Sequence, residues 1–240
     1  MDSMYVALSA QVALERRLDT IAQNVANLGT VGYRAEEVKF DAALSKAGSD
    51  STAFVSSGDS YISRRAGALT ETDNQLDVAV QGDGWFAINT PSGVAYTRDG
   101  RMRMLETGEL QTLNGYAILD VGRAPLTLDP SAGPPIIARD GMITQGGQQI
   151  GAIGLFRIDP STALDRFENS GVMPAGPATE ILDFFTNGVV QGFVEEANVN
   201  PIMEISRLIA VTRAFQAASS TIETTDSTAQ QAIRTLGETT

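Results

Sequence analysis

The sequence contains no cysteine and no histidine. The lack of cysteine excludes disulfide bonds and thiolate metal sites. The lack of histidine removes the commonest general base and the usual metal ligand, and it makes a Ser-His-Asp triad impossible. Phosphate-binding P-loops, GxSxG motifs and calcium loops are also missing from the sequence. We therefore expect no catalytic residue, no cofactor and no metal site.

Long apolar runs and basic residues are scarce as well. No run approaches the 18 or so apolar residues of a membrane-spanning helix. The N-terminus lacks the basic start and apolar middle of a secretory signal peptide. Lys and Arg number 17 against 29 Asp and Glu, so the net charge of −12 argues against nucleic-acid binding. We expect no membrane insertion, no cleavable signal peptide, no nucleic-acid partner and no small-molecule substrate.

A long amphipathic segment occupies the C-terminal end of the chain. Neither glycine nor proline occurs between Pro201 and Gly237, and Asn200 can cap the helix that this predicts. Residues at spacings of three and four form a heptad seam with three polar positions, which favours a specific partner helix. The seam consists of Ile205, Leu208, Thr212, Phe215, Ser219, Ile222, Asp226, Ala229, Ile233 and Leu236.

The N-terminal end carries a second seam, and Gly29 can stop its helix. Its positions are Met4, Ala7, Gln11, Leu14, Leu18, Ile21, Val25 and Leu28. One such helix would be expected to pack on a globular core. Two terminal seams favour a coiled-coil module that other copies of the chain complete. A closed homodimer that serves as a binding or adaptor module is the alternative.

Between these ends the apolar period changes to two from about Gln75. Dipeptides typical of hairpin turns separate the alternating runs, at 83–84, 99–100, 114–115 and 140–141. We predict an antiparallel all-β domain whose core includes Trp85, Phe86, Ile88, Leu119, Ile137, Leu155 and Phe156.

The predicted fold class is therefore α+β, mainly β. Residues 1–34 and 198–240 form the helical terminal module, and 75–197 form the central β domain. Residues 35–74 are expected to be a linker or extended segment, because 46–60 is rich in Ser, Gly and Asp.

Pairs of aspartates are the remaining candidates for chemistry. Asp73 with Asp77, or Asp83 with Asp99, could supply the acid and base of a glycosidase. Aspartate next to glycine usually serves turn geometry, so we favour the structural interpretation.

Three segments resemble the signatures of the flagellar rod and hook family. They are LDTIAQNVANLGTVGYR (18–34), GDGWFAI (82–88) with YTRDGRM (96–102), and VQGFVEEANVNPIMEISRLIAVTRAF (190–215). Arg34 stands where lysine is common, and Ala197 where serine is common. The matching residues are Ala26, Asn27, Thr30, Gly32, Tyr33, Gln191, Gly192, Glu195, Asn198, Val199, Glu204 and Arg213.

The resemblance implies a non-enzymatic structural subunit of the bacterial flagellar basal-body rod. Chain length and the short linker are most like those of proximal-rod members, with a distal-rod or hook subunit as the alternative. The family implies axial self-assembly through the terminal helices, with the β domain outside, to transmit torque for motility. It also implies export by the flagellar type III apparatus, a place in the periplasmic rod, and partners among other rod subunits and copies of the chain.

Overall fold

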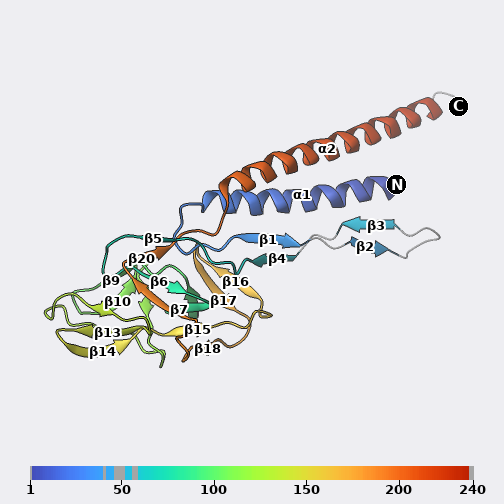
Figure 1. Ribbon diagram of the computed structural model, residues 1–240. Helices are drawn as coiled ribbons and strands as arrows, with labels where there is room; N and C mark the ends of the chain where they lie inside the picture. The colour runs from blue at the N-terminus through green and yellow to red at the C-terminus, as the bar shows by residue number, and fades with distance from the viewer. Residues whose placement is uncertain (1, 40–41, 46–51, 56–58, 238–240) are drawn as a thin grey trace. The chain divides into compact units, whose positions relative to one another are not determined.

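A computed structural model describes residues 2–39, 42–45, 52–55 and 59–237 (Figure 1). The chain forms two compact units. The helical unit comprises residues 1–26, 36–61 and 200–240, and the β unit comprises residues 27–35 and 62–199. None of the described helices is long and apolar enough to cross a membrane.

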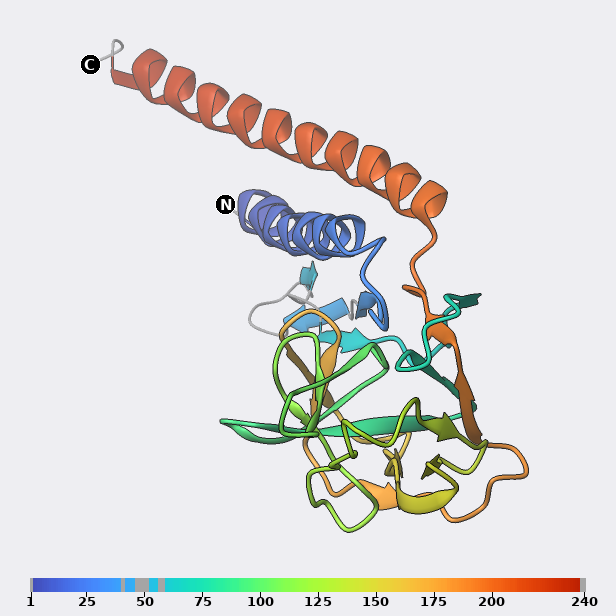
Figure 2. The same ribbon diagram turned by 90° about the vertical axis from the view of Figure 1, so that its left-hand side faces the viewer.

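Two helices dominate the helical unit, α1 (Asp2–Ala26) and α2 (Pro201–Gly237). They lie side by side and run in opposite directions (Figure 1; Figure 2). Two pairs of short strands, β1 with β4 and β2 with β3, complete the unit. The strands are β1 (Glu36–Lys39), β2 (Ala42–Ser45), β3 (Thr52–Val55) and β4 (Asp59–Ile62).

Local chemistry explains where α2 begins. The backbone N–H groups of Ile202 and Met203 both donate to Asn200 Oδ1 at 3.1 Å. These bonds satisfy two of the donors that a helix N-terminus leaves unpaired. Pro201 is the first helical residue, where its missing N–H costs nothing. The predicted start at Pro201 and end at Gly237 are confirmed.

The seam positions of both helices are mostly shielded within the single chain. On α1, Ile21 is buried, and Ala7, Gln11, Leu14, Leu18 and Val25 are half-buried. On α2, Leu208, Thr212, Phe215, Ser219 and Ile222 are half-buried, whereas Ile205 is exposed. The half-buried Leu28 belongs to the β unit. The side chains of Met4, Asp226, Ala229, Ile233 and Leu236 lie outside the described residues.

The β unit contains one large sheet, in the order β16-β17-β8-β7-β11-β10-β9, with β15 joining β7 to β18. The smaller sheets are β12-β13-β14, β19-β6 and β20-β5. All these pairings are antiparallel, which confirms the predicted class. The strands are β5 (Leu69–Glu71), β6 (Val78–Gln81), β7 (Gly84–Thr90), β8 (Gly93–Thr97), β9 (Met102–Met104), β10 (Leu110–Thr112), β11 (Ala117–Ile118), β12 (Ile136–Ile137), β13 (Met142–Gln145), β14 (Gln148–Ala152), β15 (Leu155–Arg157), β16 (Leu164–Phe167), β17 (Gly171–Pro174), β18 (Thr179–Glu180), β19 (Gly188–Gln191) and β20 (Phe193–Glu195).

Strand β7 separates two apolar clusters of the β unit. Successive side chains of a strand point to opposite faces of its sheet. Phe86 and Ile88 accordingly join one cluster, and Trp85 and Ala87 join the other. All seven core residues predicted from the sequence are buried.

The four predicted hairpin turns divide into two groups. The dipeptides at 114–115 and 140–141 connect paired strands, β10 with β11 and β12 with β13. The hairpins predicted at 83–84 and 99–100 are wrong, because β6 pairs with β19 and β9 pairs with β10. These two turns instead meet around Arg98, whose Nη2 donates to the Gly82 carbonyl at 2.7 Å.

Candidate functional site: a buried ionic junction

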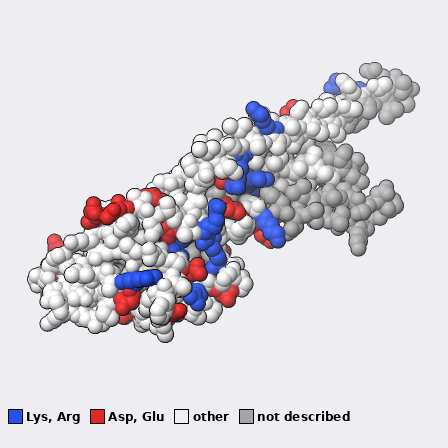
Figure 3. Space-filling view, in the orientation of Figure 1, with Lys and Arg blue, Asp and Glu red and all other residues white. Residues whose placement is uncertain are grey.

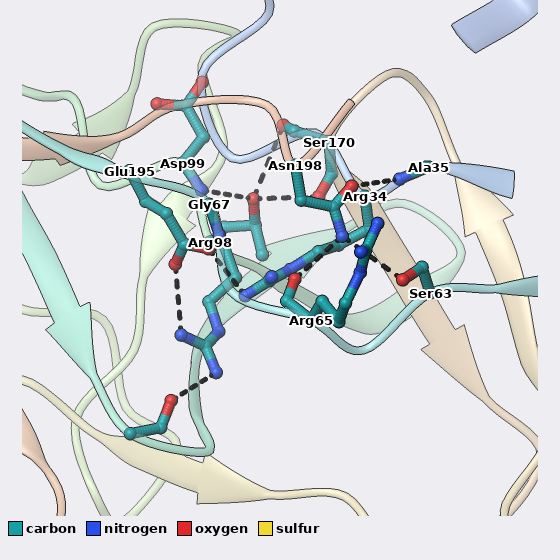
Figure 4. A network of polar contacts seen from close by, with 12 residues as sticks. Arg34, Ala35, Ser63, Arg65, Gly67, Arg98, Asp99, Ser170, Glu195 and Asn198 are labelled. Carbon is teal, nitrogen blue, oxygen red and sulfur yellow. Dashed lines mark hydrogen bonds and ion pairs between the residues drawn. The ribbon is translucent and has the colours of Figure 1, made fainter. Parts of the chain in front are cut away.

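The chain segments that follow α1 and precede α2 are joined to each other inside the β unit (Figure 4). The Gly32 N–H donates to the Glu195 carbonyl at 2.6 Å. The Ser63 N–H donates to the Ala35 carbonyl at 2.8 Å, which adds a third segment. The first of these bonds joins the N-terminal signature segment (18–34) to the C-terminal one (190–215).

The carboxylate of Glu195 lies at the centre of this junction. Its Oε1 is 2.7 Å from Arg34 Nη2 and accepts a hydrogen bond from the Gly67 N–H at 2.7 Å. Its Oε2 accepts a hydrogen bond from Arg98 Nη1 at 3.1 Å. The three charged residues are no more than 2% exposed. We call Arg34, Arg98 and Glu195 the ionic junction.

Asn198 connects the same segments through its side-chain amide. Its Oδ1 accepts a hydrogen bond from the Ala35 N–H at 2.6 Å. Its Nδ2 donates to the Arg65 carbonyl at 2.7 Å and to Ser63 Oγ at 3.3 Å. The Asn198 N–H also donates to the Tyr33 carbonyl. Asn198 thus links its own segment to two other segments of the chain. An apolar side chain of the same size could not make these hydrogen bonds.

The electrostatics of the ionic junction follow from its burial. The pKa of Arg98 is lowered to about 10, chiefly by burial and also by the nearby cation of Arg34, while the carboxylate of Glu195 offsets part of this effect. Burial also lowers the pKa of Arg34, again partly offset by Glu195. Both guanidinium carbons lie near the Trp85 ring, at 5.1 and 5.6 Å from its centroid, where the π-face favours cations. At neutral pH the junction therefore carries two cations and one anion.

Gly32 is required by the close packing of the junction. Its φ is +71°, in the left-handed region that other residues rarely adopt. A Cβ at this position would lie 2.3 Å from the backbone nitrogen of Asp99. The next residue, Tyr33, is fully buried, and the guanidinium of Arg166 lies 4.5 Å above its ring centroid. Arg166 Nη2 also donates to the Arg34 carbonyl at 2.6 Å.

Other signature residues shape the backbone on either side of the junction. After α1 ends at Ala26, the Thr30 hydroxyl donates to Asn27 Oδ1 at 3.0 Å, which closes the turn. Between β19 and β20, Gly192 takes a φ of +81°. The half-buried Val199 leads toward α2.

Gln191 anchors β19 to two neighbouring segments of the β unit. Its Nε2 donates to the carbonyls of Gln75 and Pro135, each at 2.8 Å. Its Oε1 accepts a hydrogen bond from the Ile137 N–H at 3.1 Å. All three hydrogen bonds are made to backbone groups, so they do not depend on which side chains the neighbouring segments carry.

Two signature residues belong to the helical unit and do not take part in the junction. Glu204 is 4% exposed, and its Oε1 accepts a hydrogen bond from Arg207 Nη1 at 2.6 Å. Arg213 is exposed on α2.

Sequence reasoning did not identify Arg98 as a member of the ionic junction. It also did not identify Gly67 and Ser63, which bind to Glu195 and Asn198 beside it. Arg98 lies before an Asp-Gly turn, within the segment YTRDGRM (96–102) that resembles the family, but neither feature indicates its partner. Arg98 and Glu195 are 97 residues apart in the chain, and no periodic pattern reports a contact of that range.

One aspartate of each candidate catalytic pair is held by residues close to it in the sequence. Asp77 accepts hydrogen bonds from the Thr72 hydroxyl and the Asn74 amide. Asp99 binds Arg101 through both carboxylate oxygens, at 2.9 and 2.7 Å. These contacts support the structural interpretation of the pairs. The junction itself is chemically suited to holding segments together.

Three family profiles match the sequence. They are described as flagella basal body rod protein (residues 4–34), flagellar hook protein FlgE/F/G D1 domain (residues 79–145) and flagellar basal body rod FlgEFG protein C-terminal (residues 190–235). The first and third contain the residues that meet at the junction from each end of the chain.

Similar curated proteins cover almost the whole chain. The flagellar basal-body rod protein FlgF of Mesorhizobium japonicum is 52% identical over 98% of both chains. FlgF of Rhizobium meliloti is 47% identical over 98% of this chain and 97% of its own. FlgG of Bacillus subtilis is 31% identical over 96% of this chain and 97% of its own.

Proposed function

We propose that this chain, which belongs to the flagellar basal-body rod protein family and is a structural protein of the rod, assembles axially through its two terminal helices. In this proposal its role is mechanical rather than enzymatic. The chain passes torque along the rod and binds copies of itself and other rod subunits.

The observation that carries this proposal is an exposed isoleucine stripe on α2. Ile202, Ile205 and Ile209 lie at spacings of three and four, so they share one face of the helix. Their exposed fractions are 75%, 50% and 50%. Burying an exposed isoleucine side chain yields about 1.5–3 kcal/mol, so a second helix on this face would gain several kcal/mol.

The difference in helix length supports the same proposal. Helix α1 has 25 residues and α2 has 37, and they run in opposite directions. At a rise of about 1.5 Å per residue, α2 is longer than α1 by roughly 18 Å. The predicted seam continues to Leu236, and in this proposal its last part pairs with helices of other subunits. The pairing of these seams as a coiled coil belongs to the proposal.

The ionic junction supports the mechanical part of the proposal. It joins the segments that lead to α1 and α2 through a buried carboxylate that binds two guanidinium groups. Charged hydrogen bonds of this kind are directional and stronger than neutral ones. The two segments therefore stay fixed to the β unit and to each other when load reaches either helix.

Export and position complete the proposal. The relatives named FlgF are more similar to this chain than FlgG of Bacillus subtilis is, which supports a proximal place in the rod. We infer export through the flagellar type III apparatus without a cleavable signal peptide, and a final location where the rod crosses the periplasm.

The experiment compares two exposed isoleucines in full-length protein. Ile209→Asp places a charge on the proposed interface, and Ile136→Asp places one on an exposed residue of the β unit. We expect both variants to fold, with unchanged circular dichroism. We expect only Ile209→Asp to abolish rod assembly and swimming in a bacterium whose own copy is deleted. If Ile209→Asp swims as well as wild type, the axial interface does not include this stripe.

A further inference from the structure

A cavity of about 220 Å³ opens into the β unit beside the ionic junction. Its lining includes three arginines, Arg64, Arg98 and Arg157, and one carboxylate, Asp83. Trp85, Ile158 and Pro160 form the rest of the wall. We call this cavity the arginine pocket. The charged residues of its lining sum to +2.

This concentration of positive charge is unusual for the chain. The net charge of the protein is −12. On the face of the molecule drawn in Figure 3, basic and acidic side chains of the β unit lie interspersed. In the arginine pocket the only lining carboxylate, Asp83, is exposed.

The three arginines of the pocket differ in burial and in hydrogen bonding. Arg98 is 2% exposed, and its Nε has no hydrogen-bond partner among the described residues. Arg64 is fixed, because Nη1 and Nη2 donate to the carbonyls of Ile158 and Thr162 at 3.0 and 2.7 Å. Arg157 is exposed, and its guanidinium contacts no hydrogen-bond or ion-pair partner in the described part of the chain. The pocket thus combines a buried cation, a fixed cation and a cation that can turn toward a ligand.

The buried charges next to the pocket are also out of balance. Arg34 and Arg98 share the buried carboxylate of Glu195, and the other anion that acts on Arg98 is the exposed Asp83. A buried charge is stabilised by opposite charge close to it, and an anion held inside the pocket would add to that stabilisation. The apolar walls formed by Trp85, Ile158 and Pro160 suit an anion on an aliphatic stem more than a fully hydrated ion.

We propose that the arginine pocket binds a carboxylate, and that in the rod this carboxylate is an acidic side chain of a neighbouring subunit. The assignment of the neighbour rests on the proposed function. Because this chain has an excess of acidic residues, an arginine-lined pocket offers a neighbouring copy a complementary contact. Planar guanidinium groups bind carboxylates through paired hydrogen bonds, which gives the contact a defined geometry.

Binding can be measured directly, because Trp85 is the only tryptophan and lines the pocket. Full-length protein is titrated with glutarate while tryptophan fluorescence is recorded, and sodium chloride at matched ionic strength serves as the blank. We expect a saturable change with glutarate alone. Loss of one charged hydrogen bond in Arg157→Gln should weaken binding about tenfold. Arg103→Gln, which removes an exposed arginine outside the pocket, should bind as wild type does.

A second measurement identifies the source of the carboxylate. Arg157→Glu should reduce swimming in a bacterium that lacks its own copy, and Arg103→Glu should not. Changing the contacting acidic residue of the neighbouring rod subunit to lysine should restore swimming to the strain that carries Arg157→Glu. If glutarate binds and Arg157→Glu swims normally, the neighbouring subunit is excluded and a free anion is the ligand.

The remaining outcomes separate this proposal from the rod function. Absence of a saturable fluorescence change overturns the carboxylate site. If deletion of the whole chain leaves swimming intact, the rod function itself is overturned. Normal swimming of Arg157→Glu together with loss of swimming in the deletion overturns only the role of the pocket in assembly.

Discussion

The β unit encloses two apolar clusters and the ionic junction, whereas the helical unit leaves a row of apolar side chains exposed along one helix. Strand β7 is covered on both faces, and the ionic junction pairs its charges inside the same unit. On α1, Leu8 and Val12 are 50% and 43% exposed, and the isoleucine stripe lies open on α2. The β unit therefore has an enclosed core of its own, and the isoleucine stripe on α2 is the surface that the proposed assembly would cover.

Amide hydrogen exchange on dilute full-length protein tests this difference most directly. Amides of β7 should open only with global unfolding, which costs about 5–15 kcal/mol in typical domains. Amides in the last third of α2 should open at a small fraction of that cost, because in the proposed assembly helices of other subunits stabilise this part of the helix. Mass spectrometry of peptides from both regions measures the two rates. Equal protection of both would mean that the helical unit is already complete in the monomer.

Removing the charge of Glu195 should give the next largest effect. Glu195→Gln leaves the cations of Arg34 and Arg98 buried without an anion, and such a loss costs about 3–5 kcal/mol. Urea unfolding followed by Trp85 fluorescence measures the change. Glu180→Gln, which alters an exposed glutamate in the same unit, should change stability by less than about 0.5 kcal/mol. Similar stability of the two variants would contradict the role of the junction.

Two nearby glycines, Gly29 and Gly32, allow a matched test of the packing around the ionic junction. Gly32→Ala forces a left-handed backbone on alanine and a clash with Asp99, so it should cost more than about 2 kcal/mol. Gly29→Ala meets no atom within 4 Å and should be tolerated. Thermal unfolding of both variants measures the difference. Equal melting temperatures would show that the turn can move away from Asp99.

The smallest expected effect concerns an exposed carboxylate of the β unit. The hydroxyl and backbone N–H of Ser131 donate to Asp129 Oδ1 at 2.6 and 2.8 Å, and they hold the pKa of Asp129 below its usual value. A lowered pKa adds stability above the unfolded value near 3.8, and this stability is lost as pH falls through the folded value. Ser131→Ala should raise the pKa of Asp129, which a carboxyl NMR titration measures. An unchanged pKa would mean that the hydroxyl contributes nothing in solution.

Local patterns predicted those features that neighbouring residues decide. Asn200 and Pro201 begin α2 because capping needs only the next two or three residues. The alternating residues around Trp85 and Phe86 predicted a buried strand because successive side chains point to opposite faces. The turns at 114–115 and 140–141 join strands that pair with each other, so the short-range signal was sufficient there.

The same signals failed where partners come from distant segments. Turns at 83–84 and 99–100 have hairpin dipeptides, but β6 pairs with β19 and β9 pairs with β10. The ionic junction could be predicted only in part. Glu195 and Arg98 both stand in segments that resemble the family signatures, but nothing in either segment indicates that the two side chains meet.

The sequence by itself determined the two terminal helices, the antiparallel β class, seven residues of the core and the family, because each depends on residue spacing or on contiguous motifs. Tertiary structure alone decided that one buried carboxylate joins the segments from both ends of the chain, and that three arginines line one pocket. The physical reason is that charge pairing and burial depend on which segments meet in space. The periodic pattern of apolar residues does not specify which distant segments come into contact.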